Sequence, residues 1–423
     1  MNGLPAVVLG IDSPIGLTIV RELGGHGVPV IGLGRSTAAL GMASRHLHRG
    51  LVRANGDGAL IDQLQQLGAQ LGRACLYAIA ETDIMLLNRQ QHRLTAFVPM
   101  YADAVRMARV LDKTHTYAAA ARLGLQVPRT VHITSPGALA GLTATLRFPV
   151  VLKWADPNHV APALAAAGLT LDKTHYCQTA QQLDDYLRQY APVGHYPLIQ
   201  EYCAGYGLGQ FILMHDGQPR YAFQHRRLHE WPPEGGVASL ALSVPLAEHG
   251  ALMAQSVALL RALDWDGVAM VEYRHDPASA TSALMEVNGR YWGSLPLASQ
   301  AGARFAWQSY RLLGLGLAIA QDDYTGAMRC RFMVPETKRL LRILFSPHRI
   351  ADRTLHFPRL PALAGYLLEF LRPATRYYVF RWSDPLPFVA DVGHIVLRAV
   401  RTRFRKRALG AAPLASRQQG SDV

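Results

Sequence analysis

Two short apolar runs in the middle of the chain predict a pair of neighbouring β-strands. They cover residues 267–273 and 284–290, and the stretch between them is rich in Pro, Ser, Thr and Asp. That composition is typical of a loop joining two strands. Because side chains alternate along a strand, every second residue of the later run shares one face. If the strands are neighbours, polar residues from both runs can reach one site.

The polar residues of these runs are Glu272 in the first and Glu286, Asn288 and Arg290 in the second. Carboxylate and amide oxygens suit Mg²⁺, and a guanidinium suits a phosphate. The set therefore predicts a site for a divalent cation and a phosphate. The alternative is the solvated face of an ordinary sheet. The opposite face of the second run is apolar or glycine, and a strand buried on both sides would not carry unpaired charges, which are costly to bury.

The first residues predict the opening of a doubly wound α/β sheet. Residues 7–9 read as a strand, residues 10–16 as a glycine-rich turn, residues 18–23 as helix and residues 28–33 as the next strand. The turn lacks the second glycine of the dinucleotide fingerprint G-x-G-x-x-G, since Gly10 is followed by Ile and Asp. We therefore discount NAD as a ligand.

A second strand-to-helix junction lies at residues 75–93. Asp83 stands where a helix N-cap belongs, and capping is its ordinary role. Its other role would be a substrate contact, because open sheets bind ligands at the carboxyl ends of their strands. The same two interpretations apply to Asp12 in the first turn.

From about residue 108 the pattern changes to a series of elements that each carry a polar residue near one end. Lys113 leads an alanine-rich helix, Lys153 ends a buried strand at residues 148–154, and residues 198–202 form a strand ending in Gln200-Glu201-Tyr202. A hairpin follows at residues 211–224, then a polar, Gly-rich stretch to residue 236, a strand at 238–244 and a helix at about 247–263.

In this order and spacing the motifs resemble the ATP-grasp superfamily of ATP-dependent carboxylate–amine ligases, over about residues 1–315. The resemblance implies a Rossmann-like pre-ATP-grasp domain at 1–108 with a parallel sheet. It implies an α+β ATP-grasp domain at 109–326, divided into a lysine-strand part (about 125–205) and a metal-binding part (about 206–326). Residues 327–423 would then be a basic, mainly helical extension.

The resemblance also assigns roles to residues. Lys113 and Lys153 would bind the ATP phosphates, and the Gln200-Glu201-Tyr202 segment would meet the adenine. Mg²⁺, or Mn²⁺ in its place, would be held by the acidic and amide side chains of the two central strands, namely Glu272, Glu286 and Asn288. Arg290 would stabilise the transferred phosphoryl group or an acyl-phosphate intermediate.

The chain departs from the family pattern in two places. The segment after the lysine strand is rich in alanine instead of glycine, and Lys173 beyond it would be the second phosphate lysine. The stretch 205–209 lacks the acid that relatives use to hold the ribose. Residues 224–236 resemble the substrate loop of a bacterial subgroup of unknown substrate, in which Arg226 and Arg227 would bind a carboxylate or acyl phosphate. His225 or His229 could act as a general base there, although a lone histidine is more often simply packed.

Charge sets the C-terminal part apart from the rest. Residues 327–423 hold 18 of the 43 basic and 6 of the 30 acidic residues, so this part carries nearly all of the net charge of +13. Residues 389–407 interleave apolar and basic positions, which is typical of a helix lying on an anionic membrane surface. A helical cap that shows a basic face to water is the equal alternative. Nucleic-acid binding is disfavoured, because few aromatic residues are interleaved and no known module is present.

Composition bounds the remaining expectations. The chain has 423 residues, of which 50% are hydrophobic, enough for two or three domains. Its scattered cysteines read as free thiols in a reducing compartment: Cys75, Cys177, Cys203 and Cys330. We expect no signal peptide, and the longest apolar run, 360–371, is too short for a membrane span and contains Glu369. A cytoplasmic protein, or one peripheral at the inner membrane face, is expected.

The expected activity is formation of an amide or similar bond from small carboxylate and amine substrates, with Mg-ATP and an acyl-phosphate intermediate. Two alternatives remain open: a kinase-like enzyme that stops at a phosphorylated product, and a non-catalytic nucleotide-binding adaptor that docks on membranes through its tail. The sequence does not predict the oligomeric state.

Overall fold

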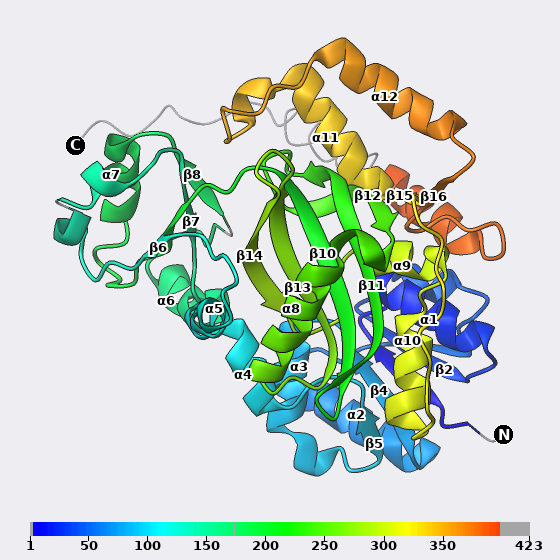
Figure 1. The fold of residues 1–423 in the computed structure, drawn as a ribbon. Helices are drawn as coiled ribbons and strands as arrows, with labels where there is room; N and C mark the ends of the chain where they lie inside the picture. Colours follow the sequence, from blue (N-terminus) through cyan, green and yellow to red (C-terminus); the bar gives the residue numbers. More distant parts are fainter. Residues whose placement is uncertain (1–2, 140, 173, 398–423) are drawn as a thin grey trace, which may run out of the picture.

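Three sheets organise the chain (Figure 1). The structure is a computed structural model that describes residues 3–139, 141–172 and 174–397. An N-terminal parallel sheet and a large central sheet share one side of the molecule, and a small antiparallel sheet forms a separate lobe at the left of the view. Within the described ranges, no helix combines the length and apolar character needed to cross a membrane.

The N-terminal sheet is parallel throughout, as expected. Its three central strands are buried on both faces because helices cover both sides, while the edge strand at residues 49–52 is mostly exposed. In spatial order the strands are β3 (Arg49–Val52), β2 (Val30–Gly34), β1 (Ala6–Leu9), β4 (Ala74–Ala78) and β5 (Phe97–Pro99). The helices of this part are α1 (Pro14–Gly25), α2 (Asp57–Leu71), α3 (Glu81–Arg89) and α4 (Ala104–Leu111).

The small lobe is built on an antiparallel sheet that carries Lys153 at the end of a strand. In spatial order its strands are β6 (Thr130–Val131), β9 (Leu198–Glu201), β7 (Val150–Lys153) and β8 (His175–Cys177). Helices α6 (Pro157–Ala166) and α7 (Ala180–Arg188) belong to this lobe, whereas α5 (Lys113–Arg122) packs against α4 and the core that the N-terminal part shares with the central sheet. One face of this sheet packs into a core of its own, which includes Val150, Leu152 and Ile199. Alternation therefore leaves Lys153 on the other face.

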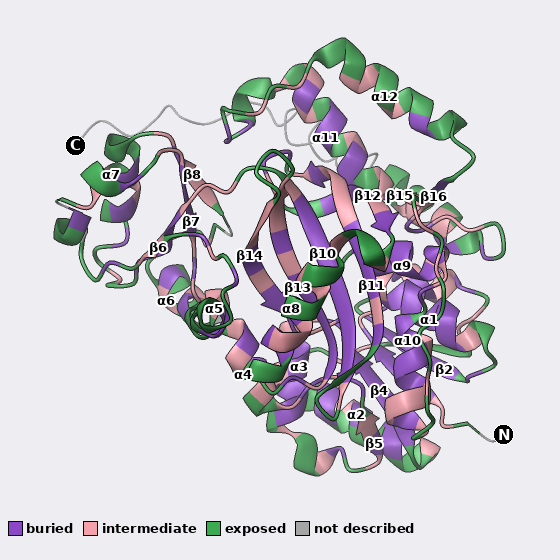
Figure 2. Ribbon diagram, viewed as in Figure 1, coloured by how far each residue is buried: buried purple, intermediate pink, exposed green. Residues whose placement is uncertain are grey.

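The central sheet has seven strands and is packed on both faces (Figure 2). In spatial order they are β14 (Thr281–Asn288), β13 (Gly267–Asp276), β10 (Tyr206–His215), β11 (Gln218–Trp231), β12 (Val237–Val244), β15 (Arg329–Arg331) and β16 (Thr375–Tyr377). Helices α8 (Gly250–Ala262), α9 (Leu295–Ala301) and α10 (Phe305–Ser309) accompany it. The expected hairpin of the two central runs is confirmed, although β13 and β14 extend further into the predicted loop.

The C-terminal extension, which we expected to be basic and mainly helical, also adds two short strands to the central sheet. Its strands β15 and β16 lengthen the central sheet beyond β12, with β15 antiparallel to β12 and parallel to β16. Helices α11 (Met333–Phe345) and α12 (Arg359–Leu371) and a helix at 386–397 surround these strands. The basic half of the predicted membrane helix, residues 398–407, lies outside the described residues.

A buried ion pair fixes the extension to the N-terminal part. Arg21 on α1 donates from Nε to Asp384 Oδ2 at 2.9 Å, and its other nitrogens donate to the carbonyls of Val379 and Asp384 at 2.8 Å. Both side chains are almost fully buried. Ser44 completes the set by donating to the same carboxylate at 2.7 Å. Removing one partner of such a pair would leave a buried charge uncompensated.

Candidate active site

Two carboxylates face one another on adjacent strands. Glu272 on β13 is the register partner of Glu286 on β14, so their side chains leave the sheet on the same face. Asn288 lies two residues further along β14 and donates from Nδ2 to Glu286 Oε1 at 2.8 Å. The predicted convergence of these three side chains is therefore present in the structure.

Three basic side chains surround Glu286, and two of them come from other elements. Lys113, the first residue of α5, places its Nζ 3.8 Å from Glu286 Oε2. Lys153 reaches the same carboxylates from the small lobe; burial lowers its pKa, and the charges of Glu286 and Glu272 oppose that effect. Arg290 donates from Nη2 to the Asn288 side-chain oxygen Oδ1 at 3.2 Å. The cluster thus joins α5, β7 and β14.

The surroundings shift the two acids in opposite directions. For Glu286, burial raises the pKa, but Lys113, the Asn288 hydrogen bond and Lys153 together outweigh it, and the pKa is lowered. For Glu272, burial raises the pKa and Arg227 only partly compensates, so the pKa stays raised. Glu286 is therefore the group that holds negative charge most firmly, with a side chain that is 38% exposed.

Arg227 continues the charged network along β11. It contacts Glu272 through Nη2 and donates from Nη1 to Glu230 Oε1 at 2.9 Å. Glu230 is also paired with Arg274 at 3.1 Å. Gly207 makes room for Arg227, because a Cβ there would lie 2.8 Å from Arg227 Cδ. A buried network of alternating charges therefore extends the acidic pair toward the C-terminal extension.

Arg226 does not reach this cluster, contrary to our expectation for both arginines. We predicted a polar loop here, whereas β11 continues as a strand to Trp231 and pairs with β10 and β12. Adjacent residues of a strand point to opposite faces. Arg226 accordingly lies over the Tyr206 ring, 5.7 Å from its centroid, while Arg227 lies beside Glu272.

The predicted adenine segment is also placed differently from expectation. The Gln200 side chain is buried and donates to Tyr117 Oη and Thr130 Oγ1, each at 3.1 Å, so it is not free to meet a base. Glu201 remains partly exposed, with Arg129 at 3.6 Å. Burial raises the pKa of Tyr202, and a hydrogen bond to Asp352 of the extension raises it further. The Tyr202 side chain therefore points to the extension.

Of the two histidines considered as bases, the structure favours one. His225 is fully buried, burial lowers its pKa well below the ordinary value, and its Nε2 lies 3.3 Å from Ser294 Oγ. His229 is partly exposed and has Nδ1 2.7 Å from a buried carboxylate, Glu336 on α11. Ser239 donates to the other oxygen of Glu336 at 2.6 Å. Lys173, the predicted second phosphate lysine, lies outside the described residues.

One residue of the N-terminal junctions contacts Arg290 of the site. Glu81, the first residue of α3, accepts from Arg290 Nε at 2.9 Å. We singled out Asp83 instead, but Ala80 is the N-cap, and Asp83 is paired with Arg53 at 3.1 Å. Asp12 accepts from the backbone N–H of residue 35. Glu81 lies closer than Asp83 to the end of the buried strand β4. This position was the sequence signal that could have pointed to Glu81.

The donor set fits a hard divalent cation. Glu272, Glu286 and Asn288 offer only oxygen ligands, which is the preference of Mg²⁺ and Mn²⁺. The carboxylates are register neighbours on one ladder, so they approach as like charges, and a cation between them would remove their repulsion. The residues present therefore fit the predicted metal.

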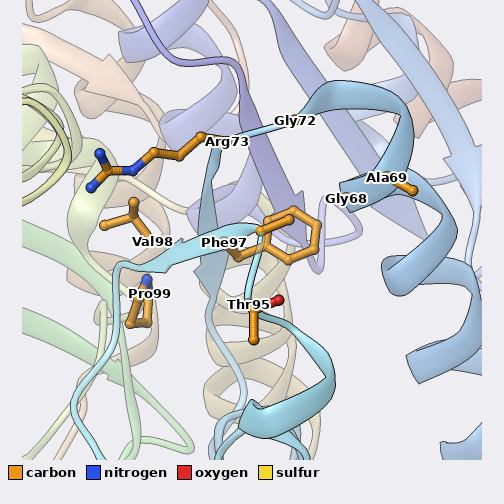
Figure 3. A pocket seen from close by; sticks show the side chains of 9 residues that line it. Gly68, Ala69, Gly72, Arg73, Thr95, Phe97, Val98 and Pro99 are labelled. Atoms are coloured by element: carbon orange, nitrogen blue, oxygen red, sulfur yellow. The ribbon is translucent and has the colours of Figure 1, made fainter.

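A pocket of about 590 Å³ lies elsewhere, in the N-terminal part (Figure 3). It is lined by the end of α2, by Gly72 and Arg73, and by residues 95–99 around β5. Gly72 and Arg73 precede β4, so the pocket lies at the amino ends of the parallel strands. Open α/β sheets bind ligands at the opposite, carboxyl edge. We therefore place the site at the acidic pair and not in this pocket.

Comparison with known proteins shows which solved structures share this fold. No protein-family model matches the chain, and no curated protein matches its sequence. Solved structures do match. The chain is similar to an L-amino acid ligase from Bacillus licheniformis with a TM-score of 0.54 at 14% identity, covering 74% of this chain and 75% of that one.

Two further structures give the same picture. The ADP complex of purK, an N5-carboxyaminoimidazole ribonucleotide synthetase, matches with a TM-score of 0.60 at 13% identity, over 81% of this chain and 88% of that one. The biotin carboxylase domain of the Hydrogenobacter thermophilus 2-oxoglutarate carboxylase, solved with MgADP, matches with 0.57 at 12% identity, over 77% and 73%. At these identities the similarity establishes the fold, and the chain has the ATP-grasp fold.

Proposed function

We propose that this protein is an ATP-dependent ligase that activates a small carboxylate as an acyl phosphate and joins it to an amine. The observation that carries the proposal is the acidic pair of Glu272 and Glu286, held opposite one another and approached by Lys113 and Lys153 from separate elements. An ordinary sheet face would not gather cations from another lobe onto one acidic pair.

The residues divide the work of the first step. Lys113 and Lys153 would hold the phosphates of ATP as point charges, and Glu201 with the neighbouring backbone would meet the adenine. Glu272, Glu286 and Asn288 would hold Mg²⁺, which when bound would neutralise charge on the phosphates. A substrate carboxylate oxygen would attack the terminal phosphorus as the bond to ADP breaks. Arg290 would stabilise the charge on the transferred group.

The second step needs a site for the acyl phosphate and a base for the amine. Arg227 is the arginine of its pair that reaches the acidic cluster, so the acid-binding role falls to it and not to Arg226. As the amine attacks the acyl carbon, phosphate leaves and the amine loses a proton. We assign that proton to His229 Nε2, because a hydrogen bond donated by Nδ1–H to Glu336 would leave Nε2 free to accept it.

The names of the similar structures support this class of substrates. One is an L-amino acid ligase, and another was solved with MgADP and bicarbonate. An amino acid is a small molecule that carries both a carboxylate and an amine, so amino acids are the first substrates to test. The kinase-like alternative differs only in its product, which would be a stable phosphorylated molecule.

The test is ADP release by the full chain with a panel of amino acids, with and without Mg²⁺. Glu286→Gln should lower turnover by about 100-fold or more, since it removes a charge aimed at the reacting groups. Glu248→Gln is the matched control, because Glu248 is 49% exposed and lies outside the cluster. Unchanged Mg-dependent turnover in Glu286→Gln would refute the metal assignment. Mass analysis of the product distinguishes an amide from a phosphorylated compound.

A further inference from the structure

The C-terminal extension exposes large apolar side chains from two helices. On α12, Leu360 is 79% exposed and Leu371 is 78% exposed. Trp382, just before the helix at 386–397, is 88% exposed, and Val389 within that helix is 60% exposed. The outer side of α12 is exposed along most of its length (Figure 2). Exposed apolar groups gathered in this way mark a binding surface.

A chain of aromatic contacts joins these helices into one surface. The ring of Phe370 on α12 lies 6.4 Å from that of Tyr377, which lies 6.4 Å from Phe380. Phe380 in turn lies 4.8 Å from Trp382 and 5.4 Å from Phe388, the latter in the 386–397 helix. We call the exposed residues around this chain the extension surface: Leu360, Leu367, Leu368, Leu371, Trp382 and Val389.

The exposed charged side chains of the described part of the extension, residues 327–397, have one sign. Between residues 327 and 397 six basic side chains are exposed: Lys338, Arg349, Arg353, Arg359, Arg372 and Arg376. None of the five acidic residues in that range is exposed; four are buried and Asp391 is half-buried. Glu369 shows why, since its carboxylate is used internally by Arg329 at 2.6 Å.

Exposed apolar side chains together with exposed basic side chains favour one kind of binding partner. A second copy of the chain would bring the same basic side chains against each other, which is unfavourable without an intervening anion. A nucleic acid would use the charges but would leave the leucines in water. An anionic bilayer satisfies both, because its interface accepts leucine and tryptophan side chains and its headgroups attract the arginines.

We propose that the extension surface docks this protein on an anionic lipid bilayer. The sequence beyond this helix, residues 398–407, holds six further basic residues. Docking of this kind needs no span through the bilayer, only burial of the exposed leucines and tryptophan to interfacial depth. The proposal does not depend on the chemistry at Glu286, because its surface lies on α12 and the helix beyond it.

The test is co-sedimentation of the full chain with lipid vesicles. One set contains phosphatidylcholine alone, and the other contains phosphatidylcholine with one third phosphatidylglycerol. We expect partitioning to the anionic vesicles at least about tenfold above the neutral ones, falling steeply with added salt. Leu371→Glu and Trp382→Ser should each weaken binding severalfold, since both substitutions remove exposed apolar area and Leu371→Glu also adds a negative charge that anionic headgroups repel.

Val105→Glu is the matched control, because Val105 is 62% exposed on α4, outside the extension. It should bind vesicles as the wild type does, and all variants should keep the same melting temperature. Equal partitioning to neutral and anionic vesicles, or wild-type binding by Leu371→Glu, would overturn the proposal. A dimer in light scattering that Leu371→Glu dissociates, without vesicle binding, would also overturn it and would make the surface an interface between copies.

Discussion

Glu22 gives the protein a pH-dependent stability whose size follows from the structure. The residue lies on α1, is 4% exposed, and accepts from the backbone N–H groups of Ala306 at 2.8 Å and Trp307 at 3.2 Å. It therefore ties the N-terminal part to α10. Burial raises the pKa of Glu22 from 4.5 to about 7, although a Ser299 hydrogen bond, the backbone bonds and the charge of Arg381 oppose the shift.

The sign of the effect follows from where the proton is held. Below pH 4.5 the carboxyl is protonated in both the folded and the unfolded chain, so it costs nothing. As pH rises toward 7, the unfolded chain releases a proton that the folded protein keeps, and the free energy of unfolding falls. Above pH 7 the folded protein carries the whole cost of the buried charge, which this pKa difference puts at about 3 kcal/mol.

Glu22→Gln should remove that cost while keeping a carbonyl oxygen for the two backbone N–H groups. At pH 8 we expect the melting temperature to rise by about 3 °C or more, given an unfolding entropy of about 2 cal/mol/K per residue. At pH 5 the gain should shrink to about a quarter, because little of the carboxyl's cost is present there. Differential scanning calorimetry of both proteins at the two pH values measures this.

Glu248→Gln serves as the control, since its side chain is 49% exposed and lies in the turn at residues 246–249, outside α1 and α10. A gain of equal size at both pH values would mean that the substitution acts through packing and not through ionisation. A loss of stability at pH 8 would refute the reasoning outright, because it would show that the ionised carboxylate is favourable in place.

Three further predictions concern the site. Lys153→Met should weaken ATP binding about tenfold or more by removing a phosphate cation, and unchanged affinity in a nucleotide titration would exclude Lys153 from the phosphate site. Arg227→Met should destabilise the protein by about 3 kcal/mol, because Glu272 and Glu230 would be left buried without this partner; unaltered thermal unfolding would contradict it. Glu336→Gln should lower kcat about tenfold with ATP affinity unchanged, and a change confined to KM would make its role structural.

The sequence predicted those features that depend on local pattern. The strand alternation of Glu286 and Asn288 placed both on one face, and the hairpin of β13 and β14 brought Glu272 opposite. The apolar strand ending in Lys153 and the helix beginning at Lys113 were likewise found from their own residues. These elements carry their signal in a few consecutive positions, so no tertiary information was needed.

The misplaced residues depend on pairing and packing between distant segments. Residues 224–231 look like a loop because they are charged, yet β10 and β12 pair with them on both sides and hold them in a strand. That pairing separates Arg226 from Arg227. The predicted place of Gln200 beside the adenine differs from the structure for a similar reason. Its hydrogen-bond partners, Tyr117 and Thr130, come from elements far from it in sequence, and they use its amide group internally.

The place of the extension decides how its function can be tested. Truncation before residue 327 would strip β15 from β12, remove Glu336 from His229, and break the buried pair of Arg21 with Asp384. Each loss would leave unpaired groups inside the remaining protein, so lost vesicle binding or lost turnover would follow from misfolding alone. Substitutions at exposed positions such as Leu371 avoid this, because the side chain contributes little to the fold and much to any docked state. Vesicle binding and ATP turnover should therefore respond to different single substitutions in the same intact chain.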